Sequence, residues 1–351
     1  MDDRSFVAGQ SFILEAKKYW TSTLYPELKA DYRRRAAKVG GEPDTVEGVR
    51  ALIEDTTLYR YFAWLERRLQ RFKYSGRYGL VPYHRERRDE LLAPLAAHGT
   101  DPNLDLDPDL EMPRYYNTVD IHQHPGGVWS DDFAGFVYER GARSTTPLIA
   151  GDHRDLHQRF TDRITEGQAP KRVLDMGCGF GKSTRPFYES FPDAEIEAID
   201  LSGPCVALGA HDAQQAQASN TRFRQMNSYE TDYEDQSFDL VTSTMLIHEL
   251  PPAEIERTFS EAYRLLESGG RMAHLDFYTL PDAFSQFIHY GHGRRNNEPF
   301  MQPWAEMDVT GVLESIGFRN VEIASFAEAE GVDLADSQAW RFPWTVVAAE
   351  K

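Results

Sequence analysis

A short apolar strand that runs directly into a glycine-rich loop sets the strongest limit on the fold of this chain. The strand covers 172–175, and Gly177, Gly179 and Gly181 follow it at every second position. Glycine is needed where the backbone takes a left-handed conformation or where a ligand must approach without meeting a Cβ atom. A helical pattern starts behind the loop, and the first N–H groups of a helix are free to bind a ligand. The order of these features predicts a ligand-binding turn between a buried strand and a helix.

Strand and helix patterns alternate from about residue 150 onward. The expected strands cover 172–175, 195–200, 221–226, 238–245, 271–276, 320–325 and 344–349, and the expected helices cover 183–189, 203–218 and 253–267. Such alternation is typical of a parallel sheet with helices on both faces. The last two strands have no clear helix between them, so we expect an antiparallel pair at one edge. The sequence therefore predicts a doubly wound α/β fold with a mostly parallel, seven-stranded, Rossmann-like sheet.

The first 150 residues have a different texture. Residues 11–98 read as mostly helical, and 101–113 hold three prolines and five acidic groups, which is typical of an irregular connection. We therefore expect an N-terminal helical region with its linker at 1–113, a connecting segment at 114–149 and a ligand-binding domain at 150–351. The connecting segment is expected to cover a cofactor or substrate. A helical region of this length is long enough to cap a pocket or to form a dimer seam.

Charge and composition narrow the classes of partner. The 351 residues carry a formal net charge of −18, of which −16 lies in residues 151–351, where 33 acidic side chains face 17 basic ones. An acidic body repels phosphate backbones, so we expect no nucleic-acid partner. No apolar run reaches the roughly 18 residues that cross a bilayer, and the first residues do not resemble a secretory signal. With two cysteines in all, we expect a cytoplasmic protein without a disulfide framework. The long N-terminal helical region would supply the seam of a homodimer.

The spacing of the glycines separates three kinds of ligand loop. A dinucleotide-binding loop needs its third glycine at position 182, which is Lys182, and a phosphate loop needs its first glycine at position 176, which is Met176. The remaining pattern, G-x-G-x-G behind Asp175, resembles motif I of the class I S-adenosylmethionine-dependent methyltransferases. Further segments with the family's order follow at 195–200, 225–228, 237–241, 265–270 and 311–318. Agreement in order and spacing makes the resemblance specific over about 150–351.

The resemblance implies a role for individual residues. The glycine loop approaches the methionine part and the ribose, Asp175 orients the loop and the cofactor's ammonium, and Asp200 holds the ribose hydroxyls. Asn227 and Ser228 resemble the segment that borders the adenine, although the family usually has an acidic residue where Asn227 stands. Tyr138 is expected to cover the cofactor carboxylate, with core packing as the alternative interpretation. The implied cofactor-binding residues are Asp175, Gly177, Gly179, Gly181, Asp200, Leu201, Asn227, Ser228 and Tyr138.

The acceptor side should lie near the carboxyl ends of the strands. His248 resembles the histidine of many small-molecule methyltransferases and is expected to act as a general base; the alternative is a histidine that only hydrogen-bonds its loop. The long segment after 276 is expected to form a lid. His122 and His124 point the same way on an extended chain and, with Asp120, offer too few ligands for a metal site, so no metal is expected. The expected substrate contacts are His122, His124, Glu249, Tyr278, His289 and His292.

The resemblance thus implies S-adenosylmethionine-dependent methylation of a small molecule. The segment at 248–252 lacks the Asn and Tyr of motifs that serve base or amide methylation, so those acceptors lose support. Two alternatives remain open. One is a methyltransferase that acts on a protein docked against the helical region. The other is a protein that binds S-adenosylmethionine without catalysis.

Overall fold

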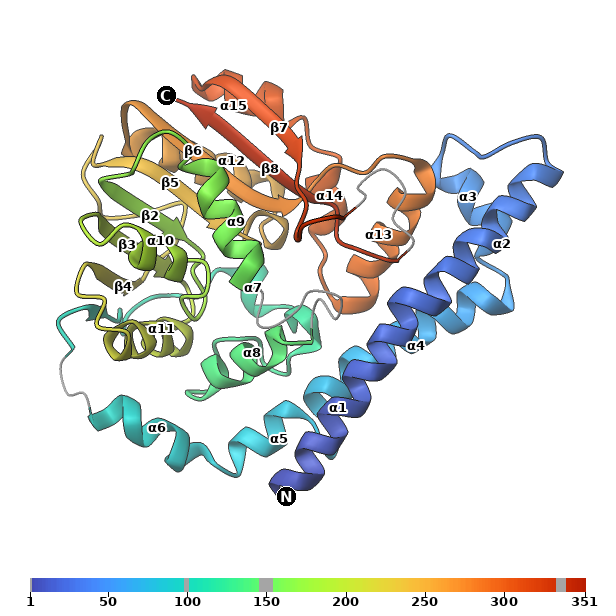
Figure 1. Cartoon of the computed structure of the whole chain (residues 1–351), viewed down its shortest axis with the longest axis horizontal. Helices are drawn as coiled ribbons and strands as arrows, with labels where there is room; N and C mark the ends of the chain where they lie inside the picture. The colour runs from blue at the N-terminus through green and yellow to red at the C-terminus, as the bar shows by residue number, and fades with distance from the viewer. Residues whose placement is uncertain (1, 98–100, 145–153, 333–338) are drawn as a thin grey trace.

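One sheet of eight strands organises the described part of the chain, which comprises residues 2–97, 101–144, 154–332 and 339–351 of a computed structural model (Figure 1). Along the sheet the order is β1-β4-β3-β2-β5-β6-β8-β7. The strands are β1 Leu104–Asp105, β2 Arg172–Met176, β3 Glu195–Asp200, β4 Thr221–Gln225, β5 Phe238–Thr244, β6 Leu266–Phe277, β7 Arg319–Ser325 and β8 Trp344–Glu350. Pairings from β1 to β6 are parallel, and β8 is antiparallel to both β6 and β7. The α/β class and the antiparallel edge pair are confirmed.

The expected number of seven strands is wrong by one. The additional strand, β1, lies in the acidic segment that the sequence marks as irregular, and Leu104 pairs with Phe223 of β4. The carboxylate of Asp105 also accepts hydrogen bonds from Arg222 and Arg224. A strand of two residues is too short to show a period of two, so the sequence gives no signal for it.

Helices cover both faces of the sheet because neighbouring strand residues point to opposite faces. Val173 packs in one core with residues of α9 and α11, whereas Leu174 packs in a second core with residues of α12 and α15. The helices of this part are α9 Arg154–Ile164, α10 Arg185–Ser190, α11 Gly203–Gln215, α12 Pro252–Leu265 and α15 Val309–Ile316. Burial on both faces agrees with the continuous apolar runs of the strands.

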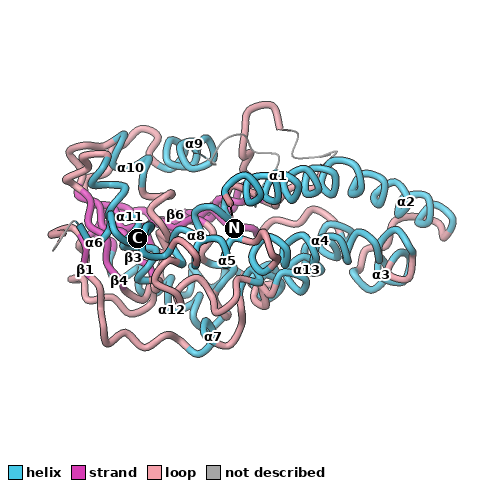
Figure 2. The backbone as a smooth tube through the Cα atoms, turned by 90° about the horizontal axis from the view of Figure 1, so that it is seen from below, coloured by secondary structure: helices cyan, strands magenta, loops and turns pink. Residues whose placement is uncertain are grey.

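The N-terminal helices are α1 Asp3–Tyr19, η1 Trp20–Leu24, α2 Tyr25–Lys38, α3 Val46–Ile53, α4 Thr57–Ser75, α5 Leu80–Arg85 and α6 Arg88–Ala97. Helices α1 to α4 extend to one side of the sheet, whereas α6 lies near β1, as Figure 2 shows. The connecting segment adds α7 Arg114–Asn117, the 3-10 turn η2 Ile121–Gln123 and α8 Ala134–Ala142. Among the described helices, none is both long and apolar enough to span a membrane.

Helix α13 Ala283–Asn296, which follows β6 and precedes α14 Met301–Ala305, joins the helical region to the sheet. The ring of Phe284 stacks on Tyr32 at 4.6 Å, and the ring of Phe287 lies 5.0 Å from that of Tyr59. The same apolar core continues to Ala273 and Leu275 of β6. The helices therefore share a core with the sheet, and they lie at the edge where the parallel strands end.

Candidate active site

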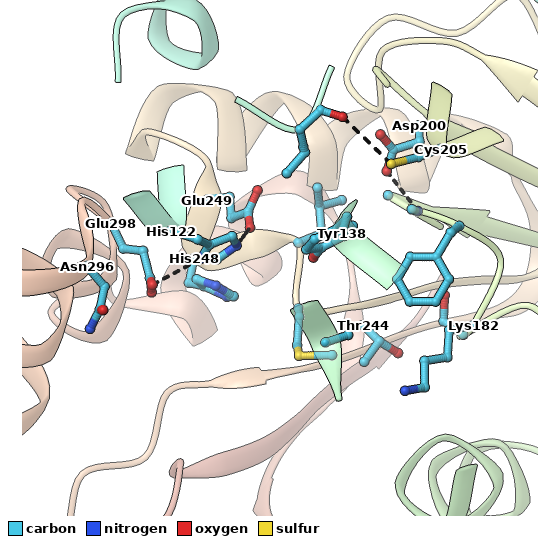
Figure 3. Close-up of a pocket in the computed structure, with 18 of the residues that line it drawn as sticks. His122, Tyr138, Lys182, Asp200, Cys205, Thr244, His248, Glu249, Asn296 and Glu298 are labelled. Atoms are coloured by element: carbon cyan, nitrogen blue, oxygen red, sulfur yellow. Dashed lines mark hydrogen bonds and ion pairs between the residues drawn. The ribbon is translucent and has the colours of Figure 1, made fainter. Parts of the chain in front are cut away.

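A cavity separates the carboxyl ends of the parallel strands from the N-terminal helices (Figure 3). It encloses about 1230 Å³ of space, including its open mouth. One end is built by the glycine loop and Asp200, and the other by polar side chains of α1, α4 and α13. The lining at this second end includes Lys17, Gln70, His122, His248, Glu249, His292, Asn296 and Glu298. The charged and polar side chains converge on this cavity from segments far apart in the sequence.

The glycine loop has the backbone that its sequence indicates. Gly177, Gly179 and Gly181 have φ angles of 68°, 54° and 81°, a region that other residues rarely adopt. Gly177 and Gly179 line the cavity, and a Cβ atom on Gly177 would lie 2.8 Å from Leu246. Gly181 faces away, with Gly209 of α11 only 3.2 Å from the position of a Cβ atom. The first two glycines therefore open the cavity, and the third permits close packing of α11.

Asp200 ends β3 and braces the glycine loop from the side. Its carboxylate accepts hydrogen bonds of 2.8 Å from the backbone N–H groups of Gly179 and Ser202. Burial raises the pKa of Asp200 to about 6, and the two N–H groups oppose that shift. Each carboxylate oxygen still has a lone pair to offer a ligand. Leu201 and Ser228 line a small adjoining pocket with Asp200, whereas Asn227 turns to its own chain and accepts from the N–H of Tyr229.

Asp175 lies beneath the loop and outside the cavity lining. It is fully buried, and its Oδ2 atom accepts hydrogen bonds of 2.7 Å from the hydroxyls of Ser183 and Thr184. Burial raises the pKa of Asp175 to about 6. Its Oδ1 atom has no partner in the described part of the chain. The observed contacts tie the end of β2 to the start of α10, and contact with a cofactor ammonium stays a prediction.

Tyr138 of α8 closes the cavity above the loop. Its ring lies 3.4 Å from the Cβ position of Gly179 and packs edge-on against Phe180, with ring centroids 5.6 Å apart. The ring of His122 is nearly parallel to it at 6.2 Å. Tyr138 is therefore part of the cavity lining, at the place where a cover for the loop would lie.

His248 and Asp276 form a buried pair at the centre of the cavity. Nδ1 of His248 lies 2.7 Å from Oδ1 of Asp276, and Asp276 also accepts from the backbone N–H groups of Ile247 and His248. Nε2 of His248 has no hydrogen-bond partner among the described residues, and the side chain lines the cavity. Burial lowers the pKa of His248, but the Asp276 carboxylate outweighs that effect, so the pKa is raised overall. Asp276 thus fixes the ring and leaves Nε2 available to a ligand.

His122 is held between two glutamates. Nε2 lies 2.9 Å from Oε1 of Glu249, and Nδ1 lies 3.0 Å from Oε1 of Glu298. Two carboxylates can be satisfied at once only by the doubly protonated ring. Although burial lowers the pKa of His122, the hydrogen bonds to both glutamates raise it to about 10, and the pKa of Glu298 falls to about 2 against its own burial. The geometry therefore indicates a partly buried imidazolium at His122, whose side chain is 18% exposed.

The end of the cavity away from the glycine loop is completed by α1, α4 and α13. Nζ of Lys17 donates to Oε1 of Gln70 at 3.1 Å and to the carbonyl of Ser144 at 3.0 Å, while Gln70 donates to the carbonyl of His122. His292 contacts Glu66, which also pairs with Arg295. These contacts hold the polar side chains in fixed orientations.

Three of the expected substrate contacts do not line the cavity. His124 packs its ring on Tyr74 at 5.0 Å, because the backbone at His122 is left-handed and the two histidines do not share a face. Burial lowers its pKa to about 3. His289 is buried, and burial likewise lowers its pKa to about 3. Tyr278 packs on Trp304 and donates to the carbonyl of Met307. These three expectations receive no geometric support, whereas His122, Glu249 and His292 do line the cavity.

Sequence reasoning missed Lys17, Gln70, Tyr116, Asn296 and Glu298, and it did not pair Asp276 with His248. One signal was present for Lys17, because it follows Ile13 by four residues and precedes Trp20 by three, which places it on the buried face of α1. A lysine on an apolar helix face needs a hydrogen-bond or ion-pair partner when that face packs against the rest of the protein. Glu66 and Gln70 interrupt the apolar face of α4 in the same way. In the described residues, no group of three or more His, Cys, Asp or Glu side chains is placed to hold a metal.

The imidazolium of His122 gives a testable dependence of stability on pH. The pKa of His122 rises from 6.5 to about 10 on folding. The contribution of this side chain to the stability of the folded state is therefore complete below pH 6.5 and is lost as the pH rises toward 10. We expect His122→Gln to lower the free energy of unfolding by on the order of 3 kcal/mol near neutral pH. The loss should shrink in chemical denaturation at higher pH.

The matched control is His84→Gln, because burial lowers the pKa of His84, so it titrates below this window. Its effect on stability should not change from neutral to alkaline pH. An effect of His122→Gln that is equally flat would show that the ring is not charged in the folded protein.

Comparison with known proteins identifies a methyltransferase domain within the chain. Residues 173–270 match a family model described as a methyltransferase domain. The chain is 32% identical over 124 residues to a demethylmenaquinone methyltransferase of Thermus thermophilus, which covers 35% of this chain and 54% of that protein. It is 29% identical over 160 residues to a ubiquinone/menaquinone biosynthesis C-methyltransferase of Rhizobium leguminosarum, which covers 44% of this chain and 61% of the relative. These matches thus span about half to three fifths of the relatives' length.

A solved structure of phosphoethanolamine N-methyltransferase 2 of Haemonchus contortus, in complex with S-adenosyl-L-methionine, is also similar. It is 16% identical with a TM-score of 0.47, over 68% of this chain and 60% of that chain. The family model covers the strand, the glycine loop and the carboxylate at the end of β3, which are the features that build one end of the cavity. Residues 173–270 therefore carry a methyltransferase domain, and the chain is similar there to S-adenosylmethionine-dependent methyltransferases of class I.

Proposed function

We propose that this protein transfers a methyl group from S-adenosylmethionine to a small-molecule acceptor. The observation that carries the proposal is the shared cavity of the glycine loop and the His248–Asp276 pair. Bound S-adenosylmethionine supplies an electrophilic methyl group on its sulfonium. The glycine loop and the His248 side chain, a candidate proton acceptor, line one enclosure, and this supports an in-line transfer.

The residues at the loop end fit the cofactor. The carboxylate of Asp200 has lone pairs left for the ribose hydroxyls, and Leu201 and Ser228 line the adjoining pocket in which an adenine would lie. Gly177 and Gly179 let the backbone approach without a Cβ atom. Tyr138 covers the loop from above. Each of these residues lines the cavity or the adjoining pocket.

His248 is the proposed general base. Asp276 holds its Nδ1 atom and supports the protonated ring, so that Nε2 can take a proton from an acceptor hydroxyl, amine or acidic C–H group. The N-terminal helices exclude water from this point because Lys17, Gln70 and Tyr74 close the cavity opposite the sheet. Asp276 acts through His248 and is a positioning residue.

The enclosed acceptor end favours a small molecule over a protein side chain. Helices α1 and α4 themselves line the cavity and leave it walled by their side chains. The two curated relatives are named for C-methylation in quinone biosynthesis and for demethylmenaquinone, which are small molecules, and this supports the proposal. A protein that only bound S-adenosylmethionine, without catalysis, would have no use for a His248–Asp276 pair held in a fixed orientation.

We further propose a homodimer in the cytoplasm. Aromatic side chains on the outer side of α1 and α4 are exposed, with Phe12 at 68%, Trp64 at 53% and Phe72 at 49%. Exposed apolar groups of this size are typical of interaction surfaces. The two cysteines are buried and unpaired, which suits a reducing compartment.

Replacing Asp200 tests the cofactor site. We expect Asp200→Ala to weaken binding of S-adenosylhomocysteine at least about tenfold in calorimetry, because the ribose hydroxyls lose their acceptor. With methyl-labelled S-adenosylmethionine and a cell extract, the wild type should label the small-molecule fraction and the variant should not. Label found only in protein would contradict the small-molecule proposal.

Asp239→Ala is the matched control. Asp239 also accepts hydrogen bonds from two backbone N–H groups, those of Lys171 and Arg172, but it lies at the amino ends of the parallel strands, away from the cavity. It should lower stability without a change in cofactor affinity. Equal losses of affinity in both variants would show that Asp200 matters only for folding.

Replacing His248 and Asp276 tests the base. We expect His248→Gln to slow transfer of label about 100-fold with cofactor affinity unchanged. Activity should rise with pH through the pKa of His248. Because the Asp276 carboxylate raises that pKa, Asp276→Asn should move the acidic limb of the profile to lower pH. An unmoved limb would mean that His248 is not the titrating group.

The dimer is tested by sedimentation equilibrium. The wild type should sediment at twice the chain mass of 40.1 kDa, and a Phe12→Ser/Trp64→Ser double variant should shift toward one chain. A wild type that sediments as a single chain at micromolar concentration would refute the proposed homodimer.

A further inference from the structure

The ammonium group of Lys17 has no carboxylate partner in the described part of the chain. Two of its three N–H groups are used by neutral acceptors, Gln70 and the carbonyl of Ser144. Gln70 cannot turn away, because its amide nitrogen donates to the carbonyl of His122. Burial lowers the pKa of Lys17 to about 8, against the effect of Glu66 and Glu298, so the group is still mostly charged at neutral pH. Lys17 thus offers a charge and an N–H group to the cavity that it lines.

The nearby carboxylates already have partners in direct contact. Glu66 pairs with Arg295 and His292, and Glu249 and Glu298 share the imidazolium of His122. A partly buried cation without a direct ion pair is costly, and it is retained most readily where a ligand supplies the opposite charge. A carboxylate on a ligand would give the Lys17 ammonium the direct ion pair that the described residues do not supply.

An aromatic wall leads from the base to Lys17. The ring of Phe277 lies 4.7 Å from that of His248 and stacks on Phe342 at 4.1 Å. Phe342 contacts Trp340 at 4.7 Å, and Trp340 contacts Trp20 at 5.1 Å. Phe277 and Phe342 line the main cavity, while Trp20 and Trp340 line a smaller pocket that shares Lys17, Gln70, His292 and Asn296 with it. This wall suits a flat apolar body whose two ends differ in polarity.

We propose that the methyl acceptor is an aromatic carboxylic acid whose carboxylate pairs with Lys17 and whose acceptor atom lies at His248. The inference rests on the proposed function and names the substrate class of the same cavity. One ammonium group matches one carboxylate charge, and the ring lies along the wall from Phe277 to Trp20. Figure 3 shows Asp200 on the opposite side of the cavity from Asn296 and Glu298, and the cofactor would lie on the Asp200 side.

The test compares acids with their amides. With saturating S-adenosylhomocysteine, calorimetry measures binding of para-hydroxybenzoate, para-hydroxycinnamate and para-hydroxyphenylacetate, each against the uncharged amide of the same shape. For at least one pair we expect the acid to bind about tenfold more tightly. In Lys17→Met this preference should fall to within about twofold. Lys18→Met is the control, because Lys18 is the neighbouring residue on α1 and pairs with exposed Glu15.

The outcomes separate the two proposals. If S-adenosylhomocysteine does not bind, the proposed function fails and the inference fails with it. If S-adenosylhomocysteine binds and no acid is preferred, or if the preference survives in Lys17→Met, only the inference is overturned. A second measurement does not need the variant to fold: the methyl-labelled product from extract should enter ethyl acetate after acidification but stay in water at alkaline pH. A product that enters the solvent equally at both would also overturn it.

Discussion

The arrangement of this molecule depends on the partly buried imidazolium of His122, which contacts both Glu249 and Glu298. Glu249 follows β5 and Glu298 follows α13, so the two carboxylates come from different layers of the structure. Each would be costly to bury alone, and together they would repel each other. The charged ring of the connecting segment hydrogen-bonds to both carboxylates and offsets one of their two negative charges, and this fixes the segment against the sheet edge. Without it, the cavity would have neither its roof nor the observed position of Glu249.

The connecting segment accepts local strain to make this contact. His122 and Gln123 both have left-handed backbones, with φ angles of 57° and 58°, which residues other than glycine adopt at a cost. Gln70 holds the carbonyl of His122, and the amide of Gln123 reaches the carbonyl of Arg295. The same bend sends His124 to Tyr74 and away from the cavity. The strained bend therefore directs His122 into the cavity and turns His124 away from it.

The loop end of the site could be predicted because its residues lie close together in the sequence. Gly177, Gly179 and Asp200 belong to one strand–loop–helix–strand unit, and local spacing determines where they lie. Gly181 and Asp175 belong to the same unit, yet they pack inside it. Spacing places a residue in the loop but does not say which side of the loop its side chain faces. His124 and Tyr278 show the same limit, because an extended segment was assumed at the first and a lid at the second. The strand β1 was not predicted for a different reason: its two residues are too few to show a periodic pattern.

The acceptor end could not be predicted in this way, because it exists only in the folded chain. Lys17, Gln70, His122 and His248 come from four segments that are separated by more than fifty residues each, and their approach depends on how the helices dock on the sheet. The information that the sequence did contain was of another kind: polar residues on helix faces that are otherwise buried. Such residues are costly unless something pairs with them, so they mark a cavity or a partner before the fold is known. Methyltransferase domains of one fold serve many acceptors. In this chain the end of the cavity away from the glycine loop is built largely by the helices that precede the domain, and the proposed acceptor therefore rests on Lys17 and the aromatic wall beside it.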